Sequence, residues 1–315
     1  MFSSDRLKKI AAEAQSAKDE KKKAWNTKSI KEKFDEVVIG NEGYKQVLSS
    51  VLAGYLSELK TRHHVIVFGP SGTGKTYMLE QTLPDLGIPY VVIDSSSLVP
   101  AGYSGNTLTE SLKEFYKSNQ TASDRGIIVL DEFDKISEKA NGGDTHKSHS
   151  IQGELLTNIQ GKKEGGIDTR NSLWIVLGAF AYADEMKQNP PEITKDDLKK
   201  YGFKNELLGR ITMEAMTETP TVEQMLERIA FSKDMKSFFD QMKLDGFELQ
   251  SDDFEDEALL ELAMVASNPL YGMRAVPTVL AAIKQKVVFS GEMKPGEVRI
   301  SGDLIRKIKS ERNLG

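Results

Sequence analysis

The stretch HVIVFGPSGTGKTYMLEQTL (64–83) joins an apolar β-forming run to a helical pattern through a glycine-rich loop. The loop matches G-x-x-x-x-G-K-[ST], and its place between a strand and a helix is the context that this phosphate-binding motif needs. Backbone N–H groups and the helix N-terminus would face phosphate oxygens. Lys75 is expected to contact the β- and γ-phosphates, and Thr76 to bind Mg²⁺. The predicted nucleotide-binding residues of the loop are Gly69, Pro70, Ser71, Gly72, Thr73, Gly74, Lys75 and Thr76.

A second apolar run, IIVLDEFDKI (127–136), ends in two adjacent carboxylates. A buried central strand would deliver both to the sheet edge that carries the phosphate loop. Asp131 is predicted to bind Mg²⁺, and Glu132 to polarise the water that attacks ATP. Together with Lys75, these residues predict an ATP hydrolase. For Asp134 we expect a structural role, as a helix cap or an ion-pair partner.

Five short β-rich runs, separated mostly by helical patterns, define the fold class. Alternation of this kind predicts a parallel sheet covered by helices on both faces. After Thr219 the pattern becomes helical, although EVRIS (297–301) is predicted to be a short strand. The β-rich runs are HVIVFG (64–69), YVVID (90–94), GIIVLDE (126–132), LWIVLGAF (173–180) and RITMEAM (210–216).

We therefore expect an α/β P-loop domain with a five-stranded parallel sheet, followed by a smaller helical lid domain. The boundaries are set at 1–34 for an N-terminal arm, 35–219 for the ATPase domain and 220–315 for the helical domain. The arm is rich in Lys, Ala and Glu and predicts a solvated helix, partly disordered. Two interpretations of the arm stay open, namely a docking segment for partners and a solvated lead-in.

Composition narrows the class of protein further. The 315 residues include 39% hydrophobic and 28% charged residues, and the formal net charge is −5. No apolar run approaches the about 20 residues that span a bilayer, and no apolar signal core opens the chain, so a cytoplasmic location is expected. The sequence contains no cysteine, which excludes thiolate zinc sites. Without a basic excess, nucleic-acid binding is possible but not indicated.

Seven motifs occur in the order found in ClpX-type AAA+ unfoldases, and the chain resembles that family from about residue 35 to 290. The phosphate loop alone is unspecific, but AGYSG followed by NELLGR and YGMRAV at suitable distances is much more specific. The motifs are VVIGN (37–41), GPSGTGKT (69–76), AGYSG (101–105), IIVLDEFDKI (127–136), GAF (178–180), NELLGR (205–210) and YGMRAV (271–276).

The resemblance implies roles for residues outside the phosphate loop. Val38 and Ile39 resemble the segment that packs against adenine, with ordinary core packing as the alternative. Arg210 resembles the arginine finger that contacts the γ-phosphate held by a neighbouring subunit, with a surface salt bridge as the alternative. Arg274 resembles the sensor-two residue that couples the small domain to nucleotide, or else is an arginine without special partner. No sensor-one residue is assigned.

Tyr103 resembles the pore-loop aromatic that grips a translocating polypeptide. Its flanking glycines permit a mobile loop, and an aromatic ring can grip many side chains without sequence preference. A tyrosine that anchors a turn is the alternative. Ser104 stands where the family usually has an aliphatic residue, which would weaken the grip. The polar segment 137–150 falls where the family has its second pore loop, and its two histidines are better explained by a solvated loop than by a metal site.

The sequence also departs from the family. The stretch from Ala179 to Asn205 contains no Ile-Gly-Phe tripeptide. In the family that tripeptide docks the ring onto the peptidase ClpP, so a ClpP partnership is not expected. The region 161–173 is shorter than its counterpart and lacks an Arg-Lys-His substrate loop.

These features favour an ATP-driven protein unfoldase that acts as a homo-oligomeric ring, by family likeness a hexamer, with ATP and Mg²⁺ as cofactors. The runner-up is a nucleic-acid-associated AAA+ switch such as a helicase loader. A scaffold that binds ATP but barely hydrolyses it is a third class, against which Glu132 and Arg210 argue. The sequence leaves the protein target unnamed.

Overall fold

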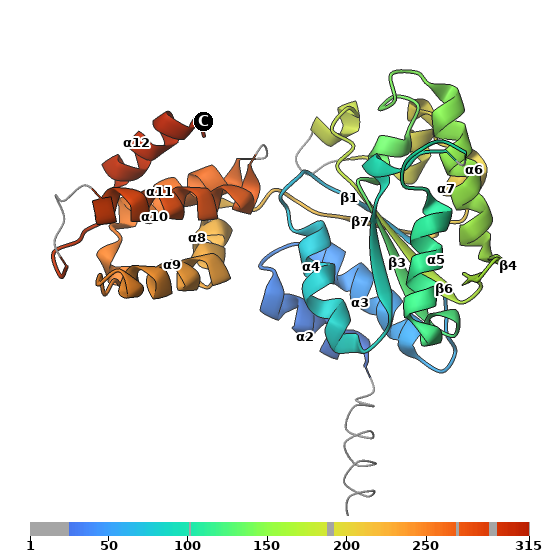
Figure 1. Cartoon of the computed structure of the whole chain (residues 1–315), viewed down its shortest axis with the longest axis horizontal. Helices are drawn as coiled ribbons and strands as arrows, with labels where there is room; N and C mark the ends of the chain where they lie inside the picture. The colour runs from blue at the N-terminus through green and yellow to red at the C-terminus, as the bar shows by residue number, and fades with distance from the viewer. Residues whose placement is uncertain (1–24, 101, 188–191, 269–270, 290–294, 315) are drawn as a thin grey trace, which may run out of the picture.

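The computed structural model describes residues 25–100, 102–187, 192–268, 271–289 and 295–314. Most of the predicted N-terminal arm, residues 1–24, lies outside them. An α/β body is followed by a separate body of helices, α8 to α12 (Figure 1). The strands are β1 Val65–Phe68, β2 Tyr90–Asp94, β3 Gly126–Asp131, β4 Lys163–Glu164, β5 Ile167–Asp168, β6 Ser172–Gly178 and β7 Met213–Met216.

Helices alternate with the strands of the first body and make up most of the second. Short 3-10 segments include η4 (Phe133–Ile136) and η8 (Gly272–Arg274). The α-helices are α2 Thr27–Val37, α3 Glu42–Leu56, α4 Lys75–Thr82, α5 Leu108–Ser118, α6 Thr145–Gly161, α7 Asn205–Leu208, α8 Val222–Ala230, α9 Lys233–Leu244, α10 Asp256–Ser267, α11 Ala275–Phe289 and α12 Gly302–Arg312.

Five strands form one parallel sheet, as the β-rich runs predict, and the structure gives their order as β2-β3-β6-β1-β7. Successive side chains point to opposite faces, so each strand contributes to two cores. Ile66 and Phe68 pack with α5, α6 and α7 on one face, whereas Val65 and Val67 pack with α2, α3 and α4 on the other. Parallel strands buried on both faces explain their continuous apolar runs. The fold class predicted from the sequence is confirmed.

The expected start of the ATPase domain, between residues 34 and 35, falls inside α2. Ile30 and Phe34 are buried in the core beneath that helix. Their spacing of four residues places both on one helix face, which holds α2 against the sheet's covering helices. The part of the predicted arm from Thr27 onward is therefore packed rather than solvated.

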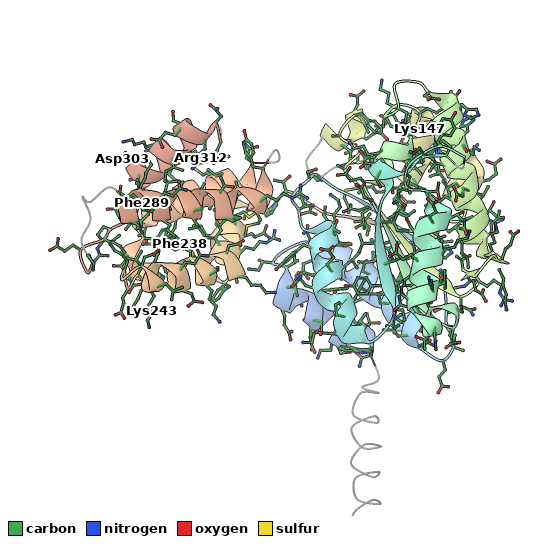
Figure 2. The ribbon with its side chains drawn as sticks, in the orientation of Figure 1. Lys147, Phe238, Lys243, Phe289, Asp303 and Arg312 are labelled. Atoms are coloured by element: carbon green, nitrogen blue, oxygen red, sulfur yellow. The ribbon has the colours of Figure 1, made fainter. Side chains whose placement is uncertain are left out.

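The helices after β7 build their own core. Phe238 lies among them and is buried, whereas Phe289 and Lys243 lie at the surface of this body (Figure 2). The predicted strand 297–301 is wrong for the described residues, because only Ile300 forms a bridge, to Phe254. Phe254 sits between a 3-10 turn and α10, so no longer run of extended backbone is available for pairing.

The predicted polar loop 137–150 is wrong in its second half, where α6 begins at Thr145. The Asp144 side chain accepts a hydrogen bond from the Lys147 backbone N–H at 3.0 Å and caps the helix. Lys147 marks this end of α6 in Figure 2. Ser148 and Gln152 also donate hydrogen bonds from this helix to Ile136 O, so the cap and these buried contacts together favour a helix in a sequence rich in polar residues.

Candidate nucleotide site

The phosphate loop leaves the end of β1 and enters α4 at Lys75. The loop is closely packed at Gly69, where a Cβ atom would lie 1.8 Å from Thr217 Oγ1. At Gly74, which precedes α4, φ is +92°, a conformation that side chains with a Cβ rarely adopt. Both glycines are thus required by the local structure, and the backbone N–H groups at the start of α4 are left available for an anion.

Lys75 is buried beneath this loop. Its Nζ donates hydrogen bonds to Gly69 O at 2.6 Å and Pro70 O at 2.8 Å. Burial lowers the pKa of Lys75 to about 8, although Asp131 and Asp134 raise it in part. The positive charge of Arg274 lowers the same pKa further, so the two cations lie close enough to interact. A cation that is poorly solvated in this way is ready to pair with a phosphate.

The predicted magnesium ligands lie together. Thr76 Oγ1 donates to Asp131 Oδ2 at 2.6 Å, which joins the start of α4 to the end of β3. Glu132 follows with an exposed side chain and a left-handed backbone, φ +50°. That conformation is uncommon outside glycine and is typical of functional sites. It turns the chain sharply away from β3, and the Glu132 carboxylate stays free of the strand.

Asp134 is buried two residues beyond Glu132. Its Oδ1 accepts a hydrogen bond from the Ala179 backbone N–H at 3.2 Å, and the Lys135 Nζ lies 3.5 Å from its Oδ2. The contact to Ala179 ties the end of β3 to the segment after β6. These two contacts, a hydrogen bond and an ion pair, support the structural role predicted for Asp134.

A group of polar contacts that the motif did not reveal holds the loop in place. Asn41 Nδ2 donates to Thr73 O at 2.9 Å, and its Oδ1 accepts from Glu218 N at 3.0 Å. The buried Tyr44 hydroxyl donates to Lys75 O at 2.8 Å. Asn41 and Tyr44 are far from the loop in sequence. The backbone φ of Asn41 is +58°, and no local sequence pattern predicts this conformation.

Val38 and Ile39 lie at the end of α2, next to this anchor. Val38 is buried, and Ile39 is partly exposed. The Val38 methyl groups lie 3.8 and 3.9 Å from the position of a Cβ on Gly74. Val38 is 1% exposed and belongs to the core beneath α2, which favours ordinary core packing for it, so the partly exposed Ile39 is the one of the two that a bound base could contact.

The helical C-terminal region closes the site from its other side. A Cβ on Gly272 would lie 2.8 Å from Gly72 Cα, so η8 touches the phosphate loop backbone to backbone. Arg274 follows in the same turn with an exposed side chain. Arg228 of α8, which the sequence reasoning did not consider, has its Nη2 3.1 Å from a Cβ position on Gly74. The sequence indicates a buried position for Arg228 only by its spacing of three residues from Met225, which places both on the apolar face of α8.

Arg210 lies at the opposite edge of the sheet. The turn that carries it leads into β7, and the Thr212 and Met213 N–H groups both donate to His64 O, just before β1 begins. The phosphate loop leaves the other end of β1, about 13 Å away at ~3.3 Å per residue. Arg210 is exposed and forms no ion pair with any described residue. The structure does not bring it to the phosphate loop of its own chain.

Tyr103 lies on an exposed loop between β2 and α5, and 61% of the residue is exposed. A hydrogen bond from Val99 N to Asn106 O at 3.0 Å closes the base of the loop. Gly102 has a φ of +92°. Within the described residues the tyrosine ring has no packing partner among the aromatic contacts, and its hydroxyl forms no hydrogen bond. The Tyr103 backbone N–H donates to Pro100 O at 3.1 Å and so takes part in a turn, while the side chain points out of it, so both interpretations of this residue stay open.

The histidines do not gather into a metal site. His149 Nε2 lies 2.5 Å from Glu138 Oε1, and no group of three or more His, Cys, Asp or Glu residues that could hold a metal occurs in the described ranges. No helix in that part of the chain is both long and apolar enough to cross a membrane.

The fold and the site define an ATPase. Residues 65–193 match the family model of the AAA ATPases, the ATPase family associated with various cellular activities. The chain thus carries an AAA ATPase domain and is an ATP-hydrolysing enzyme. More particularly, it is distantly related to ClpX over most of its length.

Three relatives show the extent of that similarity. The ATP-dependent Clp protease ATP-binding subunit ClpX of Treponema denticola is 26% identical, and the match covers 82% of this chain and 76% of that protein. ClpX 2 of Wolinella succinogenes is 27% identical, over 85% of this chain and 78% of that protein. ClpX of Azotobacter vinelandii is 26% identical, over 90% and 78% respectively.

Proposed function

We propose that this ATPase is a protein unfoldase or remodeller of the ClpX type, which pulls a protein substrate through the pore of a ring. The observation that carries the proposal is Tyr103, an exposed aromatic side chain on a loop pinned at its base by Val99 and Asn106. The aromatic ring of a tyrosine can contact many substrate side chains without sequence preference.

Hydrolysis would depend on four residues of the α/β body. Lys75 would bind the β- and γ-phosphates, and Glu132 would orient the attacking water. Thr76 and Asp131 offer two oxygen atoms in contact, which suits a hard cation such as Mg²⁺. When bound, Mg²⁺ would neutralise charge that develops on the phosphates.

A ring with shared sites accounts for the position of Arg210. An exposed guanidinium at the far edge of the sheet is available to the nucleotide of a neighbouring subunit. Arg274, whose charge acts on Lys75, would report the nucleotide state of its own subunit to the helical region. A homo-hexamer is the assembly expected from the likeness to ClpX.

Action without ClpP is part of the proposal, as is a cytoplasmic location. Independence from ClpP is supported by the sequence between Ala179 and Asn205, which lacks the Ile-Gly-Phe tripeptide. Purified ClpP should neither bind the ring nor be activated by it. Degradation of a model substrate by the two proteins together would contradict this part alone.

The test separates hydrolysis from pulling. The target is captured in the native host with a Glu132→Gln variant, in which slowed hydrolysis should retain the substrate. Tyr103→Ala should then leave basal ATPase within a few-fold of wild type but abolish remodelling of that target. Tyr103→Phe keeps the aromatic ring and is the matched control, which should remodel normally.

Full remodelling by Tyr103→Ala would refute threading. Salt-sensitive DNA binding that stimulates the ATPase would instead support a nucleic-acid-associated switch.

A further inference from the structure

Arg228 is a buried cation without a counter-charge. Its side chain extends from α8, and 9% of the residue is exposed. The Nη1 atom is buried and has no hydrogen-bond partner among the described residues, and no ion pair to this side chain occurs there. Burial lowers the pKa of Arg228, and only Tyr77 opposes that shift. A buried guanidinium in this state is costly, so the nucleotide-free fold gains nothing evident from it.

The position of Arg228 points to the missing partner. Its Nη2 lies 3.1 Å from the Cβ position on Gly74, the residue just before α4, and the Val38 methyl groups lie within 4 Å of the same point. The guanidinium thus stands where the phosphate loop meets the apolar end of α2. Lys75 points the other way, toward Gly69 O and Pro70 O at the start of the loop.

We infer that Arg228 binds the α-phosphate of the nucleotide and so provides a second contact from the helical region to the bound ligand, besides Arg274. A nucleotide with its base at the end of α2 and its β-phosphate at Lys75 would place its α-phosphate between the two, near Gly74, where the Arg228 guanidinium lies. An anion is the partner that an unpaired buried cation lacks, and guanidinium donates to phosphate oxygens along parallel directions. The inference rests on the phosphate role proposed for the Gly69–Thr76 loop.

The proposal predicts opposite signs for stability and for binding. Arg228→Met removes the buried charge and keeps most of the side-chain volume, so the thermal midpoint of the nucleotide-free protein should stay the same or rise. ADP affinity, measured by titration calorimetry with Mg²⁺, should fall by about 10- to 100-fold, the usual effect of losing a hydrogen bond to a charged group. Arg228→Lys should lose less, because it retains the charge.

A matched control tests whether any contact between the two bodies has this effect. Lys233 Nζ donates to Gln81 Oε1 at 2.8 Å, also from the helical region to the α/β body. Lys233→Met should change ADP affinity by less than about twofold, since exposed polar pairs contribute little. Lys75→Ala should abolish binding. If it does not, the loop assignment fails, whatever the Arg228 variants show.

Ligand variants identify the group that Arg228 contacts. The fold loss caused by Arg228→Met should be equal for ADP, GDP and 2′,3′-dideoxy-ADP, because all three carry the same α-phosphate. A loss that depends on the base, or that vanishes with the dideoxy sugar, would overturn the α-phosphate assignment. ADP affinity within twofold of wild type would overturn the proposal, as would a lowered thermal midpoint or misfolding of both variants.

Discussion

The contact between Gly72 and Gly272 should couple the helical region to the phosphate loop, and Gly272→Ala should break it. A Cβ on Gly272 would stand 2.8 Å from Gly72 Cα. Carbon atoms that are not bonded prefer about 3.5–4.0 Å, so the two backbones must separate by roughly 1 Å. Neither atom belongs to a flexible side chain that could move aside.

The effect of Gly272→Ala has two contributions, the backbone conformation at Gly272 and the clash with Gly72, and they can be separated. The φ of +58° at Gly272 makes alanine cost about 1–2 kcal/mol in conformational energy, of which ~0.4–1 kcal/mol is regained from the unfolded chain. Gly246 has a φ of +87° with no atom within 4 Å of its Cβ position. Gly246→Ala therefore carries the backbone cost without the clash and is the matched control.

The assay is steady-state ATP hydrolysis at saturating Mg-ATP, together with thermal unfolding of both variants. Each variant should lose about 1 kcal/mol of stability by the difference of the two backbone terms, and Gly272→Ala should lose more because of its clash. Only Gly272→Ala should also lower kcat, by about 10- to 100-fold, because a shift near 1 Å at a phosphate site is enough for such a loss. Equal kcat values in the two variants would refute the idea that this contact positions the loop.

Glu132→Gln should retain ATP binding while turnover falls by about 100-fold or more, since the water loses its orienting carboxylate; near-normal turnover would remove that assignment. Arg210→Ala should bind ATP but hydrolyse it poorly, and mixing it with Glu132→Gln should partly restore hydrolysis, because some subunit interfaces then combine the intact residues of both variants. ATPase activity that stays proportional to protein concentration down to monomeric samples would contradict a shared site. Burial lowers the pKa of His64 to about 4, below the ordinary 6.5, while Trp174 N donates to its Nδ1. The unfolded chain therefore binds this proton first, and up to about 3 kcal/mol of stability should be lost as pH falls from 6.5 to 4. His64→Asn should flatten that part of the pH–stability curve.

Patterns within short stretches were enough to predict the sheet and the phosphate loop. Apolar runs, the glycine spacing and the Asp131-Glu132 pair all act on residues close in sequence, and parallel strands bring their carboxyl ends to one edge without further information. The contact between Thr76 and Asp131 follows directly from that rule. Strand ends were less predictable: β7 begins at Met213, three residues after the predicted start, because the preceding turn through Arg210 consumes the first residues of the run.

Only the tertiary structure decided how the distant segments complete the site. Asn41 and Tyr44 anchor the loop through bonds that cross more than 30 residues, which no local pattern encodes. The sequence named Arg274 only through family likeness and passed over Arg228, since an arginine on a helix is ordinarily solvated. Burial against Gly74, which sets Arg228 apart from the other arginines, arises only when the helical region brings this side chain to the phosphate loop, and so the physical reason for its role lies in the fold.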